Sequence, residues 1–175
     1  VDRLDAWLHS LLNFLNPLKP VFVVSVLSDC ADNALSLLAP RLTQKNISIE
    51  RNYWEQKAET MLDRDLMEQA VYGLISNALD ASPHNAKIIL SMDSKIESVG
   101  LSIEDQGKGI SVEPTRKGLF PGPTTKSQGS GLGIPFAYKV CDLHDGTLQF
   151  EKGKFGGTRV IIWVPFREST GISHD

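Results

Sequence analysis

Apolar residues recur in alternating steps of three and four along the start of the chain. The positions in this stripe are Val1, Leu4, Leu8, Leu11, Leu15 and Leu18. A mean spacing near 3.5 residues is typical of a helix in a coiled coil or helical bundle. Pro17 and Pro20 are expected to end the helix, because proline lacks a backbone donor and clashes with the preceding turn. The pattern predicts that residues 1–20 form the last helix of a dimerising stalk; a short helix packed on its own domain is the alternative.

Three further segments have the spacing of amphipathic helices. They cover residues 24–41, 65–81 and 133–143. The first of these presents an apolar face that consists of Leu27, Ala31, Ala34, Leu35 and Leu38. The second is expected to start at a side-chain cap, either Asp63 or Asp65, and to end before Ser82-Pro83.

Five segments alternate or concentrate apolar residues in the manner of half-buried strands. They cover residues 47–53, 87–92, 99–105, 147–151 and 158–164. We therefore predict an α/β fold, a two-layer sandwich of a mixed five-stranded sheet with about three helices on one face. The coiled-coil-type helix precedes this domain, which is expected to span residues 21–166 and to be followed by a tail over residues 167–175.

The composition excludes some classes of partner and of site. A net charge of −3 gives no general reason to expect nucleic acid or an anionic membrane as a partner. Cys30 and Cys141 lie far apart without metal-site spacing, which is typical of a reducing compartment and indicates a cytoplasmic location. Because no run of 18 apolar residues occurs, no membrane span is predicted. The chain begins at Val1 rather than Met, so a membrane anchor elsewhere in a parent protein stays open.

Two polar residues lie beside the apolar face of the predicted helix over residues 65–81. Asn77 is adjacent to that face, and Asp80 follows one turn later on the same side. An amide oxygen near a carboxylate suits Mg²⁺, which prefers oxygen ligands and keeps several waters. An ordinary polar helix flank is the alternative interpretation.

An acidic residue and two spaced glycines follow the predicted strand over residues 99–105. The sequence there is Asp105-Gln106-Gly107-Lys108-Gly109-Ile110. A carboxylate at a strand end can accept a hydrogen bond from an exocyclic amine such as that of adenine. The glycines let the backbone turn sharply and approach a flat ring. A tight turn without a ligand is the alternative.

Two further glycine-rich stretches occur near the end of the chain. Gly129-Ser130-Gly131-Leu132-Gly133-Ile134 leads into a predicted helix, where consecutive backbone N–H groups can bind phosphate oxygens. Thr124-Thr125-Lys126 just before it can add hydroxyls and a cation. The stretch lacks the Gly-Lys-Ser/Thr ending of a Walker A loop and the preceding strand of a dinucleotide fingerprint. Gly156-Gly157-Thr158 opens the last predicted strand, and alone it indicates only a hairpin turn.

Taken in order, these elements resemble the catalytic domain of sensor histidine kinases, within the superfamily of gyrase, heat-shock chaperone and mismatch-repair ATPases. Asn77-Ala78 resembles the N box, and Leu119-Phe120 with Thr124-Thr125-Lys126 resembles the F box and lid. The three glycine boxes correspond to Asp105–Ile110, Gly129–Ile134 and Gly156–Thr158. The resemblance covers residues 21–166, and the threonine pair with lysine is most similar to the nitrogen-regulation type.

The resemblance implies a site for ATP or ADP with Mg²⁺. Asp105 would bind the adenine amine with support from Thr158, and Gly107, Gly109 and Ile110 would complete that end. Asn77 would hold Mg²⁺, with Asp80 nearby. The phosphates would contact Thr125, Lys126, Gly129, Gly131, Leu132 and Gly133, beneath a lid over residues 111–128. Asn77 and Lys126 would be the catalytic residues.

The chain also departs from the family. Gly73 stands where the ATPases have a glutamate base and where histidine kinases commonly have a second asparagine. Because glycine cannot abstract a proton, transfer to another nucleophile is favoured over hydrolysis. The F box is one residue short and rich in proline.

His9 lacks the acidic residue and the proline spacing of a phosphoacceptor, so the acceptor histidine is expected outside the chain. His144 is expected in a turn, and His84 and His174 in a loop and the tail.

The predicted function is therefore transfer of the γ-phosphoryl group of Mg-ATP to a histidine on the dimerisation domain, and onward transfer to a response regulator. The expected partners are that domain, the regulator and a second copy bound through residues 1–18, without nucleic acid. A nucleotide-binding regulatory module without kinase activity is the first alternative, and a clamp-type ATPase is the second.

Overall fold

The structure is a computed structural model that describes residues 18–54, 57–109 and 133–167. The predicted stalk helix therefore lies almost wholly outside the described residues. The described elements are β1 (Val23–Val26), α2 (Leu27–Lys45), β2 (Ser48–Asn52), β3 (Glu59–Leu62), α3 (Arg64–Ala81), β4 (Lys87–Lys95), β5 (Ser98–Glu104), α4 (Gly133–Leu143), β6 (Thr147–Lys152) and β7 (Thr158–Pro165).

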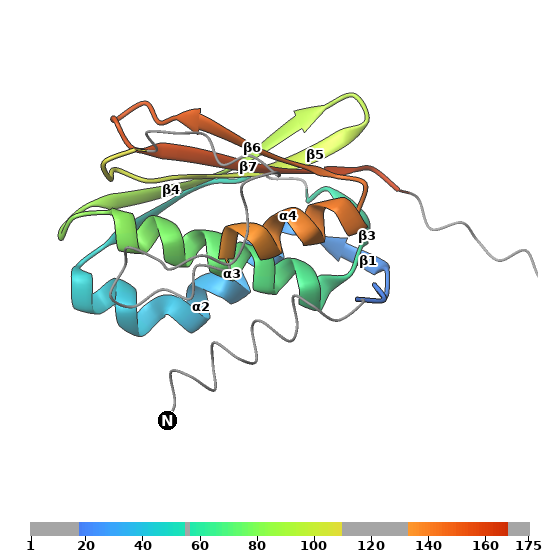
Figure 1. Ribbon diagram of the computed structural model, residues 1–175, viewed down its shortest axis with the longest axis horizontal. Helices are drawn as coiled ribbons and strands as arrows, with labels where there is room; N and C mark the ends of the chain where they lie inside the picture. Colours follow the sequence, from blue (N-terminus) through green and yellow to red (C-terminus); the bar gives the residue numbers. More distant parts are fainter. Residues whose placement is uncertain (1–17, 55–56, 110–132, 168–175) are drawn as a thin grey trace, which may run out of the picture.

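The main layer is a five-stranded sheet in the order β2-β4-β5-β7-β6. β2 pairs with β4 in parallel, and the other neighbours are antiparallel, so the sheet is mixed. Helices α2, α3 and α4 all lie on one face of it (Figure 1). The predicted α/β sandwich of a mixed sheet and three helices is confirmed.

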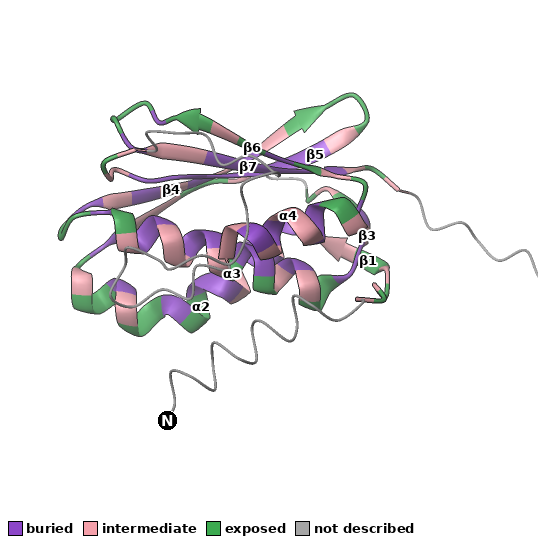
Figure 2. Ribbon diagram, viewed as in Figure 1, coloured by how far each residue is buried: buried purple, intermediate pink, exposed green. Residues whose placement is uncertain are grey.

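The core fills the space between the sheet and the three helices. Figure 2 shows the buried positions of the strands and helices between these two layers. Alternate residues of β5 and β7 point into this space, because successive side chains of a strand face opposite sides. The fully buried members include Leu27, Leu38, Met67, Ile75, Ile88, Leu90, Leu101, Ile103 and Ile162.

A second, two-stranded sheet was not predicted. β1 pairs antiparallel with β3, from Val23 opposite Leu62 to Val26 opposite Glu59. The prediction of a helix from residue 24 was therefore wrong at its start, since the β-branched residues there pair as a strand and α2 begins at Leu27.

The end of α2 also differs from the prediction. The helix was predicted to end near residue 41, but it continues past Pro40 to Lys45, and its C-cap is Asn46, whose φ is 52°. Pro40 is exposed, so its ring faces solvent and the helix loses one backbone hydrogen bond without a packing defect.

Helix α3 crosses α4 at a pair of glycines. An ideal Cβ placed on Gly73 would lie 3.3 Å from the Cα of Gly133, which is the first residue of α4. The N-terminus of α3 is capped by Asp63, one of the two predicted caps, which accepts a hydrogen bond from the N–H of Leu66. The close glycine contact brings the N-terminus of α4 against the middle of α3.

Candidate functional site

Asp105 lies just after the end of β5 with its carboxylate oriented by backbone amides. The residue is 5% exposed, and its Oδ1 accepts hydrogen bonds from the N–H groups of Gly107 (2.7 Å) and Thr158 (3.3 Å). Its own N–H donates to the carbonyl oxygen of Thr158 across 2.9 Å. The structure therefore brings together Asp105 and Thr158, which the sequence separates by more than 50 residues.

The turn that joins β6 to β7, residues 153–157, packs directly on Asp105; we call it the glycine turn. A Cβ on Gly157 would overlap both the carbonyl oxygen and Oδ1 of Asp105. Gly109 has a φ of +77° and faces the carbonyl oxygen of Gly156. Only glycine fits these positions without moving the backbone, so the first and third glycine boxes meet around the Asp105 carboxylate.

Asn77 lies in the fourth turn of α3, beside the start of α4. An ideal Cβ on Gly133 would lie 3.1 Å from Nδ2 of Asn77 and 3.4 Å from the carbonyl oxygen of Gly73. The Asn77 amide is thus adjacent to the N-terminal end of α4, where unpaired backbone N–H groups attract anions. The structure thus brings together Asn77 and Gly133, which are both predicted site residues.

Asp80 forms an ion pair with Arg41 of helix α2. Its Oδ1 accepts a hydrogen bond from Nη2 of Arg41 at 2.6 Å, and Nη1 of Arg41 donates to the Ser76 hydroxyl at 2.7 Å. Lys45 donates to the carbonyl oxygens of Leu79 and Asp80. The structure therefore places Asp80 in the contact between α2 and α3, and its predicted role near a metal stays a prediction.

A hollow of about 360 Å³ opens next to the glycine turn. Its lining consists of Lys108, Gly109, Phe150, Glu151, Lys152, Gly156 and Gly157. Phe150 offers an apolar surface, while Lys108 and Lys152 are exposed cations. Sequence reasoning did not assign Lys108 or Lys152 to the site, although Lys108 lies inside the first glycine box.

The comparisons with known proteins identify the family of the chain. Residues 62–168 match the profile of a family described as histidine kinase-, DNA gyrase B-, and HSP90-like ATPases. The chain belongs to this family. The match includes every residue so far placed around Asp105 and Asn77.

Two curated relatives of this ATPase family are bacterial kinases. Sporulation kinase C of Bacillus subtilis is 25% identical over 171 residues, which is 97% of this chain and 40% of the relative. The sensor histidine kinase ZraS of Escherichia coli O157:H7 is 26% identical over 164 residues, which is 94% of this chain and 36% of the relative. The chain thus spans less than half of the length of either relative.

The solved histidine kinase ThkA, in complex with the response regulator protein TrrA, shares the fold. Its TM-score is 0.80 at 22% identity, and the match covers 95% of this chain and 48% of that one.

No helix within residues 18–54, 57–109 and 133–167 is long and apolar enough to cross a bilayer.

Six of the predicted site residues of this family lie outside the described residues. They are Ile110, Thr125, Lys126, Gly129, Gly131 and Leu132, together with the lid over residues 111–128. The predicted site residues that the structure describes are Asn77, Asp80, Asp105, Gly107, Gly109, Gly133 and Thr158.

The Asn77 amide could supply one oxygen ligand to a magnesium ion. Among the described residues, no group of three or more His, Cys, Asp and Glu side chains could form a metal centre. One amide oxygen suits Mg²⁺ if substrate phosphates and waters supply the other ligands.

Proposed function

We propose that the chain binds Mg-ATP and transfers its γ-phosphoryl group to a histidine on the dimerisation domain of a sensor kinase, for onward transfer to a response regulator. The main support is the buried Asp105 carboxylate, held by two backbone amides beside a hollow. Membership of the ATPase family and two curated relatives with kinase names point to the same activity. A solved neighbour in complex with a response regulator suggests the final acceptor.

Each proposed role follows from the chemistry of the residue. Asp105 accepts a hydrogen bond from the adenine 6-amino group, and Thr158 helps to fix its orientation. Asn77 offers its amide oxygen to Mg²⁺, which when bound would neutralise charge on the phosphates. The N-terminus of α4 at Gly133 attracts the phosphates through its backbone amides. Phosphoryl transfer needs mainly positioning and charge neutralisation, and these groups supply both.

The roles of the residues outside the described ranges stay part of this proposal. Thr125 and Lys126 contact the phosphates, together with the backbone of Gly129, Gly131 and Leu132. Ile110 completes the adenine end. Residues 1–18 pair with a second copy of the chain in the stalk of the parent protein.

Gly73 favours transfer to a protein nucleophile over hydrolysis. It has no side chain to act as a base, and the backbone of Gly133 fills the space where a Cβ would project. The same departure favours a regulatory module without kinase activity as the second candidate. A measurement of phosphoryl transfer to an acceptor histidine distinguishes the kinase from the regulatory module.

The adenine site is tested by the substitution Asp105→Asn and calorimetric titration with ADP and magnesium. The amide oxygen of asparagine can still accept the N–H bonds of Gly107 and Thr158, so the fold should survive. The substitution removes the negative charge and the carboxylate oxygen that would accept the adenine amine, so measurable ADP binding should be abolished. Glu97→Gln, an exposed acid in the turn between β4 and β5, is the matched control and should bind as the parent chain does. Equal affinity of the Asp105 variant and the parent would refute the adenine assignment.

The transfer step is tested with labelled ATP and a separately produced acceptor helix bundle. Labelling of the bundle histidine, and of a response regulator added afterwards, is the expected result. Intact ADP binding without any labelling would favour the regulatory module. Substantial phosphate release without an acceptor would favour a clamp-type ATPase.

A further inference from the structure

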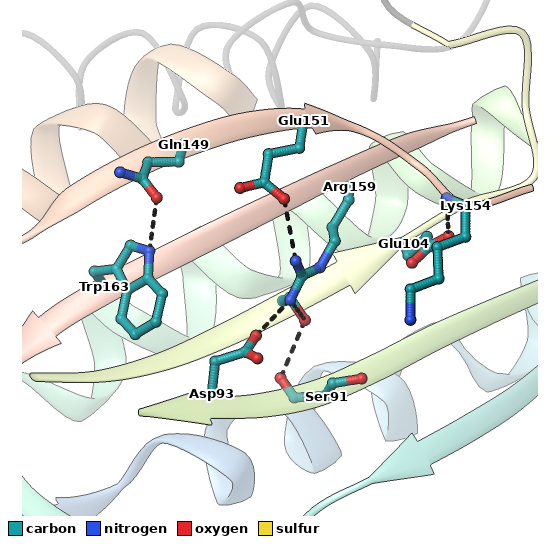
Figure 3. A network of polar contacts seen from close by, with 9 residues as sticks. Ser91, Asp93, Glu104, Gln149, Glu151, Lys154, Arg159 and Trp163 are labelled. Carbon is teal, nitrogen blue, oxygen red and sulfur yellow. Dashed lines mark hydrogen bonds and ion pairs between the residues drawn. The ribbon is translucent and has the colours of Figure 1, made fainter. Parts of the chain in front are cut away.

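A second buried acid, Glu104, lies directly before Asp105 on the opposite face of the sheet. Glu104 is only 6% exposed. Its side chain projects away from the helices, because successive side chains on a strand point to opposite faces of the sheet. The backbone N–H of Lys154 donates a hydrogen bond to its Oε1 across 2.6 Å. Figure 3 shows this bond at the end of the sheet, apart from the pairs that Arg159 makes with Asp93 and Glu151.

Glu104 anchors the glycine turn through that bond. Lys154 is the second residue of the turn, and the Cγ of Glu104 lies 3.3 Å from an ideal Cβ on Gly153. The turn closes on itself by a 2.8 Å hydrogen bond from the N–H of Gly153 to the carbonyl oxygen of Gly157. The carboxylate therefore fixes the start of the turn, and the turn fixes the position of Gly157.

The far side of the same turn determines where the Asp105 carboxylate lies. Gly157 packs against the carbonyl oxygen and Oδ1 of Asp105, and the next residue, Thr158, donates to Oδ1 at 3.3 Å. That bond is longer than the usual 2.7–3.2 Å range for N–H···O, so a small shift of the turn is enough to break it. The two successive acids thus hold opposite sides of one turn.

We propose that Glu104 is a positioning residue for base selection, which holds Asp105 where it accepts a 6-amino group and rejects a 6-oxo group. This inference rests on the proposed nucleotide function. A purine with a 6-oxo group presents an acceptor to the carboxylate, so two oxygens face each other without a proton. Such a mismatch discriminates strongly only when the carboxylate is fixed in place, because a buried polar group left unpaired is costly.

The test compares the affinities for ADP and inosine diphosphate, both with magnesium, by calorimetry. The parent chain should prefer ADP. Glu104→Gln should keep this preference, because its amide oxygen can still accept the N–H of Lys154. Glu104→Ala should lower the ratio of the two affinities by about tenfold, which corresponds to about 1.4 kcal/mol.

Two further variants separate positioning from general stability. Glu104→Asp retains the charge but is one methylene too short to reach Lys154, so its ratio should also fall; it decides the question if Glu104→Ala does not fold. Asp93→Ala removes an acid from the same sheet face whose ion-pair partner, at 2.6 Å, is Arg159 rather than a residue of the glycine turn. Its melting temperature should fall while its affinity ratio stays that of the parent.

The possible results distinguish a failure of the positioning role of Glu104 from a failure of the proposed nucleotide function. An unchanged ratio in Glu104→Ala or Glu104→Asp, with only a lower melting temperature, would overturn the positioning role. A fall in Glu104→Gln equal to that in Glu104→Ala would also overturn it. A parent chain that binds neither nucleotide, or binds both equally, would instead overturn the proposed function of Asp105.

Discussion

The Nε2 atom of His144 accepts a hydrogen bond from the backbone N–H of Asp63 across 2.9 Å. The other ring nitrogen lies 2.8 Å from the carbonyl oxygen of Val140, so the neutral ring carries its proton on Nδ1. Asp63 in turn caps α3 and accepts the N–H of Val21 from the segment before β1. One imidazole therefore ties the end of α4 to the start of α3, the two helices that hold Gly133 and Asn77.

This buried imidazole predicts a loss of stability in mild acid. Burial lowers the pKa of His144, whereas the unfolded chain has a histidine pKa near 6.5. The unfolded state therefore binds the proton first. The free energy of unfolding should be constant above about pH 6.5 and fall as the pH decreases toward the lower folded pKa. Thermal unfolding between pH 8 and pH 5 measures it.

Two histidine variants test whether the loss of stability in acid comes from the His144 ring. His144→Gln should reduce stability by about 1–3 kcal/mol at pH 8, since it disturbs a buried hydrogen bond, and should remove most of the decline between pH 6.5 and 5. His84→Gln, at an exposed position, should leave both the stability and its pH profile as in the parent. A decline that persists in His144→Gln would assign the effect to other groups.

The strands and helices of the main layers were predictable because each has a local pattern. β4 and β5 alternate, and α3 has a cap and a repeating apolar face. The small sheet of β1 and β3 was missed because strands of four residues leave almost no periodicity. Their pairing joins residues about 36 apart, and no local pattern encodes such a contact.

The site was predictable only in part, for the same reason. The glycine motifs identified Asp105 and its neighbours, whose spacing reflects backbone geometry. The spacing of Asn77 and Asp80 on one helix side could not reveal that Arg41 of α2 holds Asp80. His144 lies in the turn between α4 and β6, as predicted, but its burial to 1% exposed could not be predicted, because residues distant in the sequence cover it.

The different surroundings of Asn77 and Asp80 predict different effects on magnesium dependence. Asn77→Ala should bring the ratio of ADP affinities with magnesium and with chelator close to one, because it removes the proposed side-chain ligand. Asp80→Asn should change that ratio by less than about twofold, since Arg41 already occupies the carboxylate, and should cost below about 1 kcal/mol of stability. A ratio near one in Asp80→Asn, measured by calorimetry, would make Asp80 a metal ligand.

Gly73→Ala should separate stability from nucleotide binding. Alanine favours a helix interior by about 0.5–1 kcal/mol, which offsets the crowding of its Cβ against Gly133. The N-terminus of α4 must move away by a few tenths of an ångström, and ADP affinity should fall by roughly threefold to tenfold, equivalent to about 1 kcal/mol. Gln69→Ala, on the exposed side of α3, is the control and should leave ADP binding intact. Unimpaired binding by Gly73→Ala would show that the glycine contact does not matter to the site.

The thiol of Cys30 should react only when the protein opens. The residue is 1% exposed on α2, and burial, with the charge of Glu68, raises its pKa to about 12. At pH 8 only about one thiol in ten thousand is the reactive thiolate, and reagents cannot reach it. In a Cys141→Ser variant, iodoacetamide should label Cys30 slowly under native conditions and rapidly in denaturant, which mass spectrometry can follow. If opening limits the reaction, the native rate should rise in the stability variants above, most of all in His144→Gln. Rapid native labelling that does not change with stability would mean that α2 detaches locally from the core.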